Sequence, residues 1–148
     1  MKWVWTIVFS MGVHTCNAQN NLVPNPSFED SVYCPYTPGQ INATEAWFSV
    51  RGSIDYYHTC GTNGYGVPNN LVGVQSAKEG RAYIGIALWA LVIENGREYV
   101  SVELLEQLEP EKRYLLEMHV SLADSLHYSV KNIGIHLSSH ILSSDINS

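Results

Sequence analysis

The sequence predicts an all-β fold, an antiparallel β-sandwich, on three observations. Residues 21–75 are rich in Gly, Pro, Asn and Tyr, and this composition leaves room only for short strands and ordered loops. Later segments alternate apolar and polar side chains with the period of two that is typical of a half-buried strand. Polar turns separate these segments, and several strands of similar length joined by turns indicate an antiparallel sandwich.

The chain opens with the pattern of a secretory signal peptide, which we expect to comprise residues 1–19. Lys2 is the only charge before Glu29, and residues 3–13 (WVWTIVFSMGV) form an apolar stretch that is followed by small and polar residues up to Ala18-Gln19. A membrane-spanning helix needs roughly 20 apolar residues, so we expect no transmembrane segment. The pattern therefore predicts a secreted protein.

Cleavage at this point leaves residues 20–148, which suit a single domain. Without Lys2 the mature chain has 7 basic residues against 14 acidic ones, a net charge of −7. It contains no basic patch or arginine cluster, so the phosphate attraction that dominates nucleic-acid binding is missing. We expect no nucleic-acid partner.

The cysteines predict one disulfide. Cys16 lies in the leader, where His14 and Thr15 do not suit a lipoprotein cleavage site. Cys34 and Cys60 then remain, an even number for an oxidising compartment, and closing the loop between them would stabilise the fold by about 3.5 kcal/mol. A catalytic thiol and a metal site are the alternatives, but the sequence contains no Cys-x-x-Cys pair. We predict the bridge Cys34–Cys60.

The strands are expected in the following order. Residues 21–29 (NLVPNPSFE) form the opening strand of the mature domain. Residues 81–88 (RAYIGIAL) and residues 98–105 (EYVSVELL) both alternate apolar and polar positions. Each is therefore predicted to be a half-buried strand.

Two further strands are predicted after a polar turn that contains Pro110. They are residues 113–122 (RYLLEMHVSL) and residues 130–137, which place three aliphatic side chains on one face. A short helix over residues 104–108 is the competing interpretation, because Glu, Leu and Gln are good helix formers. Pro110 argues against a longer helix.

Motifs along almost the whole mature chain resemble one family. After residues 21–29 they are Cys34-Pro35, Gly39-Gln40-Ile41, Ala46-Trp47, Asp55-Tyr56-Tyr57, Cys60-Gly61, Val67-Pro68-Asn69-Asn70, Gly73-Val74-Gln75, Gly80-Arg81-Ala82-Tyr83-Ile84-Gly85, Arg97-Glu98-Tyr99, Tyr114, Val120-Ser121-Leu122-Ala123-Asp124-Ser125 and Asn132-Ile133-Gly134. The chain resembles a jelly-roll module of secreted and outer-membrane-associated bacterial proteins. That module is similar to galactose-binding-like carbohydrate-binding domains.

The resemblance implies an antiparallel jelly-roll β-sandwich, located outside the cell or on the outer-membrane surface. Its partner would be a glycan or another component of the cell envelope. A structural Ca²⁺ ion is implied near the first strand, with Glu29 and Asp30 as ligands, and a solvated acidic turn is the alternative. No other cofactor is expected. Members of the family continue beyond Asn132-Ile133-Gly134, so we expect the closing strands to be missing and roughly the last ten residues to be disordered.

Aromatic residues are the candidate ligand-binding groups, because flat rings suit the apolar faces of sugars. Tyr56, Tyr57 and Tyr65, in a loop-rich region, are better candidates for exposure than Trp47, and packing under the loops is the alternative. Trp47 and Trp89 complete the set. A tryptophan that precedes a strand packs in the core more often than not, so we expect Trp47 to be structural.

The sequence supports a catalytic site less well than a binding site. Asp55 and His58 have the Asp-x-x-His spacing of some serine esterases, but no Gly-x-Ser-x-Gly motif supplies a nucleophile. His58 and Cys60 could form a thiolate pair, which the expected disulfide would consume. We therefore expect a non-enzymatic binding module, with carbohydrate as its ligand. The alternative is a structural or adhesion domain, and a hydrolase ranks third.

Overall fold

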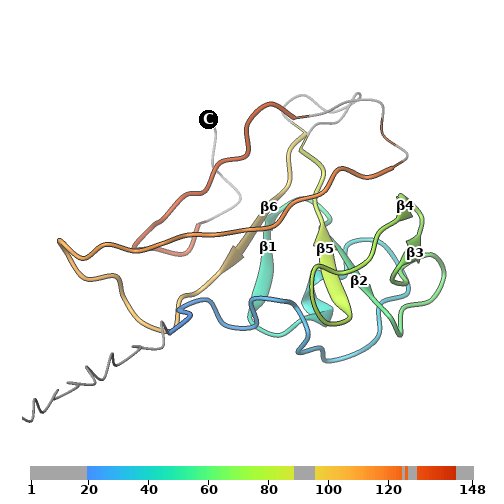
Figure 1. Ribbon diagram of the computed structural model, residues 1–148, viewed down its shortest axis with the longest axis horizontal. Helices are drawn as coiled ribbons and strands as arrows, with labels where there is room; N and C mark the ends of the chain where they lie inside the picture. The colour runs from blue at the N-terminus through green and yellow to red at the C-terminus, as the bar shows by residue number, and fades with distance from the viewer. Residues whose placement is uncertain (1–19, 89–95, 125, 127–129, 143–148) are drawn as a thin grey trace, which may run out of the picture.

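The computed structural model describes residues 20–88, 96–124, 126 and 130–142 (Figure 1). Within these ranges the regular structure consists of short strands and a single turn of 3₁₀ helix. The elements are η1 (Ile41–Ala43), β1 (Trp47–Arg51), β2 (Asp55–His58), β3 (Asn69–Asn70), β4 (Gly73–Val74), β5 (Ala82–Gly85) and β6 (Tyr99–Val102). The leader, Trp89 and the last six residues lie outside the described ranges.

The described strands form three antiparallel pairs. β1 pairs with β6, β2 pairs with β5, and β3 pairs with β4 in a tight hairpin. In Figure 1 the first two pairs stand next to each other, and the β3–β4 hairpin projects at one side. The all-β class and the antiparallel pairing are confirmed.

The sheet of β1 and β6 contains a bulge. The register runs from Trp47 opposite Val102 to Ser49 opposite Val100, and it then shifts by one residue before Arg51. Gly52 follows with a positive φ of 88°. The bulge and this glycine turn the chain towards β2.

The core lies between β2, β5 and η1. Tyr56 is fully buried against Ala43 and Ala82, and Phe28 and Ile84 pack around this centre. Tyr56 stands opposite Ile84 in the ladder. The turn of η1 and the opening segment therefore close the core over one face of the β2–β5 sheet.

Residues 21–29 do not form the predicted strand. Asn25 and Phe28 both have positive φ values, 44° and 62°, and the Phe28 amide donates to the Asn25 carbonyl at 3.1 Å. This is a β-turn with Pro26 at its second position, where the proline ring sets the required φ. The two prolines also remove donors that a strand would need, so the segment becomes a turn.

The predictions for the later part of the chain are partly wrong. β5 and β6 fall inside the predicted segments 81–88 and 98–105 but are shorter, while residues 104–108 contain no helix. Residues 113–122 and the described residues 130–137 are extended but unpaired, and most of their apolar side chains are exposed. Alternation supplies an apolar face, but a strand also needs a neighbouring backbone to bond with.

In the described part of the chain, no helix has the length and apolar character needed to cross a membrane.

Candidate functional site

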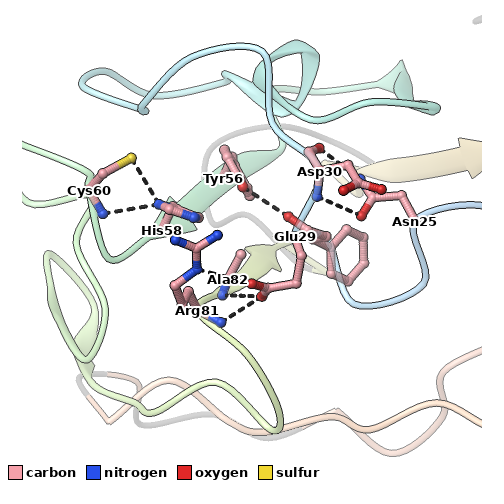
Figure 2. Close-up of polar contacts among 9 residues, drawn as sticks. Asn25, Glu29, Asp30, Tyr56, His58, Cys60, Arg81 and Ala82 are labelled. Atoms are coloured by element: carbon pink, nitrogen blue, oxygen red, sulfur yellow. Dashed lines mark hydrogen bonds and ion pairs between the residues drawn. The ribbon is translucent and has the colours of Figure 1, made fainter.

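The side chain of Asn25 organises the opening turn (Figure 2). Its Nδ2 donates to the carbonyls of Asp30 at 2.9 Å and Glu45 at 3.0 Å, and its Oδ1 accepts from the Asp30 amide at 3.0 Å. One amide group thus satisfies three backbone groups from two segments. An asparagine suits this position because it is among the few residues that tolerate a positive φ.

Aromatic side chains anchor the same turn to the core. Trp47 Nε1 donates to the Asn25 carbonyl at 2.9 Å, and the Trp47 ring lies 4.8 Å from that of Phe28. The Tyr56 hydroxyl donates to the Phe28 carbonyl at 2.9 Å. The half-buried Trp47 therefore has the structural contacts that we expected of it.

Glu29 joins the opening turn to the start of β5. Its Oε1 accepts hydrogen bonds from the backbone amides of Arg81 at 2.6 Å and Ala82 at 2.9 Å. Its Oε2 lies 3.4 Å from Arg81 Nε, and the Arg81 side chain is mostly exposed. Figure 2 shows the carboxylate beside these donors.

This arrangement does not suit Glu29 as a calcium ligand. Its oxygens already face two amide donors and a guanidinium group, whereas Ca²⁺ needs free oxygen lone pairs. Among the described residues, no group of three or more His, Cys, Asp or Glu side chains is placed to hold a metal ion. A Ca²⁺ ion at Glu29 and Asp30 stays an untested prediction.

The predicted bridge between Cys34 and Cys60 is confirmed. Their sulfur atoms are 2.06 Å apart and their Cα atoms 5.5 Å apart. Both residues are exposed. The bridge joins the loop after the opening turn to the loop after β2.

His58 contacts the Cys60 end of this bridge. Its Nδ1 accepts a hydrogen bond from the Cys60 amide at 3.0 Å and is 2.8 Å from Cys60 Sγ. Its Nε2 is buried and has no hydrogen-bond partner among the described residues. Burial, together with the Arg81 charge, lowers the pKa of His58 below its usual value, and Glu29 opposes the shift. The ring is therefore neutral at pH 7.

Asp55 does not position His58. Its Oδ1 accepts from the Gly39 amide at 2.9 Å, and its Oδ2 accepts from the Tyr57 hydroxyl at 3.2 Å. Residues three apart on a strand point to opposite faces, and Asp55 and His58 lie at the two ends of β2. The Asp-x-x-His spacing therefore brings no carboxylate to this histidine.

The prediction that Tyr56, Tyr57 and Tyr65 are candidates for exposure is wrong, because each side chain is 3% exposed or less. The Tyr57 ring stacks on Tyr65 at 5.8 Å and meets Tyr83 at 5.2 Å. Burial raises the pKa of Tyr57, and the Asp55 carboxylate adds to the effect. These rings fill the core under the loops, and a ligand could not stack on them without displacing those loops. Their predicted role in ligand binding has not been tested.

Two exposed tyrosines are not among the aromatic residues that the sequence predicts as ligand-binding groups. Tyr33 and Tyr36 flank the Cys34 end of the bridge and are 37% and 54% exposed. The Tyr33 hydroxyl donates to Asn42 Oδ1 at 3.1 Å, and Asn63 Nδ2 donates to the Tyr36 carbonyl at 3.2 Å. Their position beside Cys34 was the available signal.

Arg81 was also missed, and its contact with Glu29 joins residues 52 positions apart. No local pattern identifies such a pair.

Comparison of the chain with protein-family models, with curated proteins and with solved structures gives no match.

Proposed function

We propose that this chain is a secreted binding module whose ligand is carbohydrate, on a glycan or another cell-envelope component. The observation that supports this proposal is a set of four exposed residues around Cys34, namely Tyr33, Tyr36, Asn42 and Asn63, called here the Tyr33–Tyr36 surface. It replaces the buried tyrosines as the candidate ligand site.

The chemistry of the surface suits sugars. Two exposed tyrosines offer phenol rings with apolar faces. Asn42, which accepts from the Tyr33 hydroxyl, and Asn63, which donates to the Tyr36 carbonyl, offer amide donors and acceptors. Sugars present apolar C–H faces surrounded by hydroxyl groups, so they match such a mixed surface.

The surface is also held in shape before a ligand arrives. Gln40 is buried, and its Oε1 accepts from the amides of Tyr36 at 2.7 Å and Thr37 at 2.9 Å. The Thr62 amide donates to the Pro35 carbonyl at 2.9 Å, next to the disulfide. A preformed surface loses less conformational entropy when it binds.

The jelly-roll type of sandwich and the removal of a signal peptide belong to the same proposal. Antiparallel pairing of every described strand supports the first, and the disulfide supports passage through an oxidising compartment. Amino-terminal sequencing of the secreted protein tests the second.

A glycan array tests the ligand class. We expect the full chain to be retained on one group of polysaccharides. Tyr33→Ala and Tyr36→Ala should each weaken this retention about tenfold or more, because each variant removes one aromatic hot spot. Tyr114→Ala is the matched control, since Tyr114 is 44% exposed but lies far along the chain in an unpaired segment. Equal retention of all three variants would move the site elsewhere.

A structural or adhesion role is the second candidate, and exposed apolar side chains favour it. Residues 113–122 expose Leu115, Leu116, Val120 and Leu122 on an unpaired extended segment. Large exposed apolar surfaces mark protein contacts. Failure to bind any polysaccharide, together with capture of an envelope protein that Leu116→Ser and Val120→Ser abolish, would favour this role.

A further inference from the structure

We propose that the Cys34–Cys60 bridge is a thiol-exchange site in which His58 stabilises the Cys60 thiolate when the bridge opens. This inference is independent of the proposed ligand. It rests on three features of the described residues: the exposure of both cysteines, the fixed position of His58, and the contact of His58 Nδ1 with Cys60 Sγ.

The bridge joins two exposed residues. Cys34 and Cys60 are both exposed, whereas His58, which Figure 2 draws beside the Cys60 sulfur, is only 4% exposed. We expect a small thiol to approach the bridge from solvent while the imidazole stays in place. Exposed disulfides are the ones that exchange readily.

The position of His58 relative to Cys60 is fixed by a turn. The Gly61 amide donates to the His58 carbonyl at 2.7 Å, which closes a four-residue turn, and the Thr59 amide donates to the Arg81 carbonyl at 3.0 Å. The Cys60 amide then binds Nδ1 directly. Opening the disulfide leaves the two backbone hydrogen bonds in place, so the Cys60 sulfur would remain beside Nδ1.

Burial, together with the Arg81 charge, lowers the pKa of His58 and favours a neutral ring while the bridge is closed. Arg81 and Glu29 are the charged groups that act on it, and they oppose each other, while the neighbouring Tyr56 ring is uncharged. A thiolate on Cys60 would add a negative charge at the 2.8 Å contact with Nδ1. That charge favours a proton on Nδ1, and the resulting thiolate–imidazolium pair lowers the pKa of the thiol.

Thiol exchange at the bridge proceeds in two steps. The sulfur of a small-molecule thiol bonds to Cys34 Sγ, the disulfide bond breaks, and its electron pair stays on Cys60 Sγ. The proton that the thiol releases is taken up by His58 Nδ1, which then donates to the Cys60 thiolate instead of accepting from the Cys60 amide. A second thiol then attacks the mixed disulfide, which releases Cys34 as a thiol and oxidises the two small molecules to one disulfide. Cys60 is the leaving group because the better stabilised thiolate leaves faster.

Two single-thiol variants provide the first test. Cys34→Ala leaves only the Cys60 thiol of the bridge, and Cys60→Ala leaves only Cys34, so both lose the same crosslink. Alkylation with iodoacetamide across pH, followed by mass spectrometry, gives the pKa of each thiol. We expect the Cys60 value to be about 1 unit or more below the Cys34 value. Equal values would overturn the proposal.

The second test keeps the bridge and therefore the fold. His58→Asn retains an acceptor for the Cys60 amide but cannot hold the proton. With dithiothreitol as the reductant at pH 7.5, we expect the variant to be reduced roughly five to ten times more slowly than the unchanged chain. A merely structural role for His58 predicts the opposite, because a loosened loop is reduced faster. An unchanged or faster rate would overturn the proposal.

Discussion

The Glu29 carboxylate accepts a hydrogen bond from the Arg81 backbone amide at 2.6 Å, and this bond ties the opening turn to the first residue before β5. The same oxygen also accepts from the Ala82 amide. The acidic turn that suggested a metal ligand is thus part of the scaffold. It holds the strand that covers the buried Tyr56.

Replacing Glu29 should destabilise the fold. We expect Glu29→Ala to lower the free energy of unfolding by about 2–3 kcal/mol, because two backbone donors lose a charged acceptor. Glu29→Gln keeps one acceptor oxygen and should cost about half as much. Urea denaturation measures both, and Glu106→Ala, on an exposed residue, should change stability by less than about 0.5 kcal/mol. Equal effects of Glu29→Ala and the control would show that the contact contributes nothing.

Gly80 allows this contact to form. It has a positive φ of 67°, and a Cβ at this position would overlap the Glu29 carboxylate. Gly80→Ala should therefore lower the free energy of unfolding by at least about 1 kcal/mol. Gly134→Ala is the matched control, since a Cβ there meets nothing within 4 Å. Thermal denaturation of the two variants should separate them, and identical melting temperatures would contradict the prediction.

Stability should fall on the acid side because of His58. Burial lowers the pKa of His58 in the folded protein below its unfolded value of 6.5. The unfolded chain therefore binds a proton more readily, and stability declines as pH falls from about 6.5 towards the folded pKa. Above 6.5 this histidine makes no pH-dependent contribution.

Urea midpoints between pH 4.5 and 8 measure the effect, with His58→Asn for comparison. The decline in stability of the unchanged chain relative to this variant should begin near pH 6.5. A difference that stays constant across the range would show that His58 does not titrate with unfolding.

Two substitutions of Tyr57 distinguish a packing role of its ring from a ligand-binding role of its hydroxyl. Tyr57→Phe keeps the ring against Tyr65 and loses only the hydrogen bond to Asp55, so we expect a cost of about 1 kcal/mol and unchanged glycan retention. Tyr57→Ala removes a buried ring and should cost about 3–5 kcal/mol. Circular dichroism and the glycan array are measured on the same samples. Loss of retention in a fully folded Tyr57→Phe would restore the hydroxyl as a ligand contact.

Local patterns predicted part of the fold and little of the site. Alternation correctly located β5 and β6, because a strand with one buried face must repeat every two residues. The same alternation failed for residues 113–122, where no partner backbone is available in the described structure. The contact of Arg81 with Glu29 joins segments 52 positions apart, so no local pattern could identify it, whereas the position of Tyr33 beside Cys34 was the only signal for that residue.

The sequence by itself determined the all-β class and the pairing of Cys34 with Cys60, because periodicity and the number of available cysteines are properties of the chain alone. The tertiary structure alone decided that Tyr56 and Tyr57 are core residues and that Glu29 serves β5. Burial depends on what covers a side chain, and a hydrogen bond across 53 positions depends on where two segments meet. Neither burial nor such a hydrogen bond is a local property of the sequence, so only the folded chain specifies them.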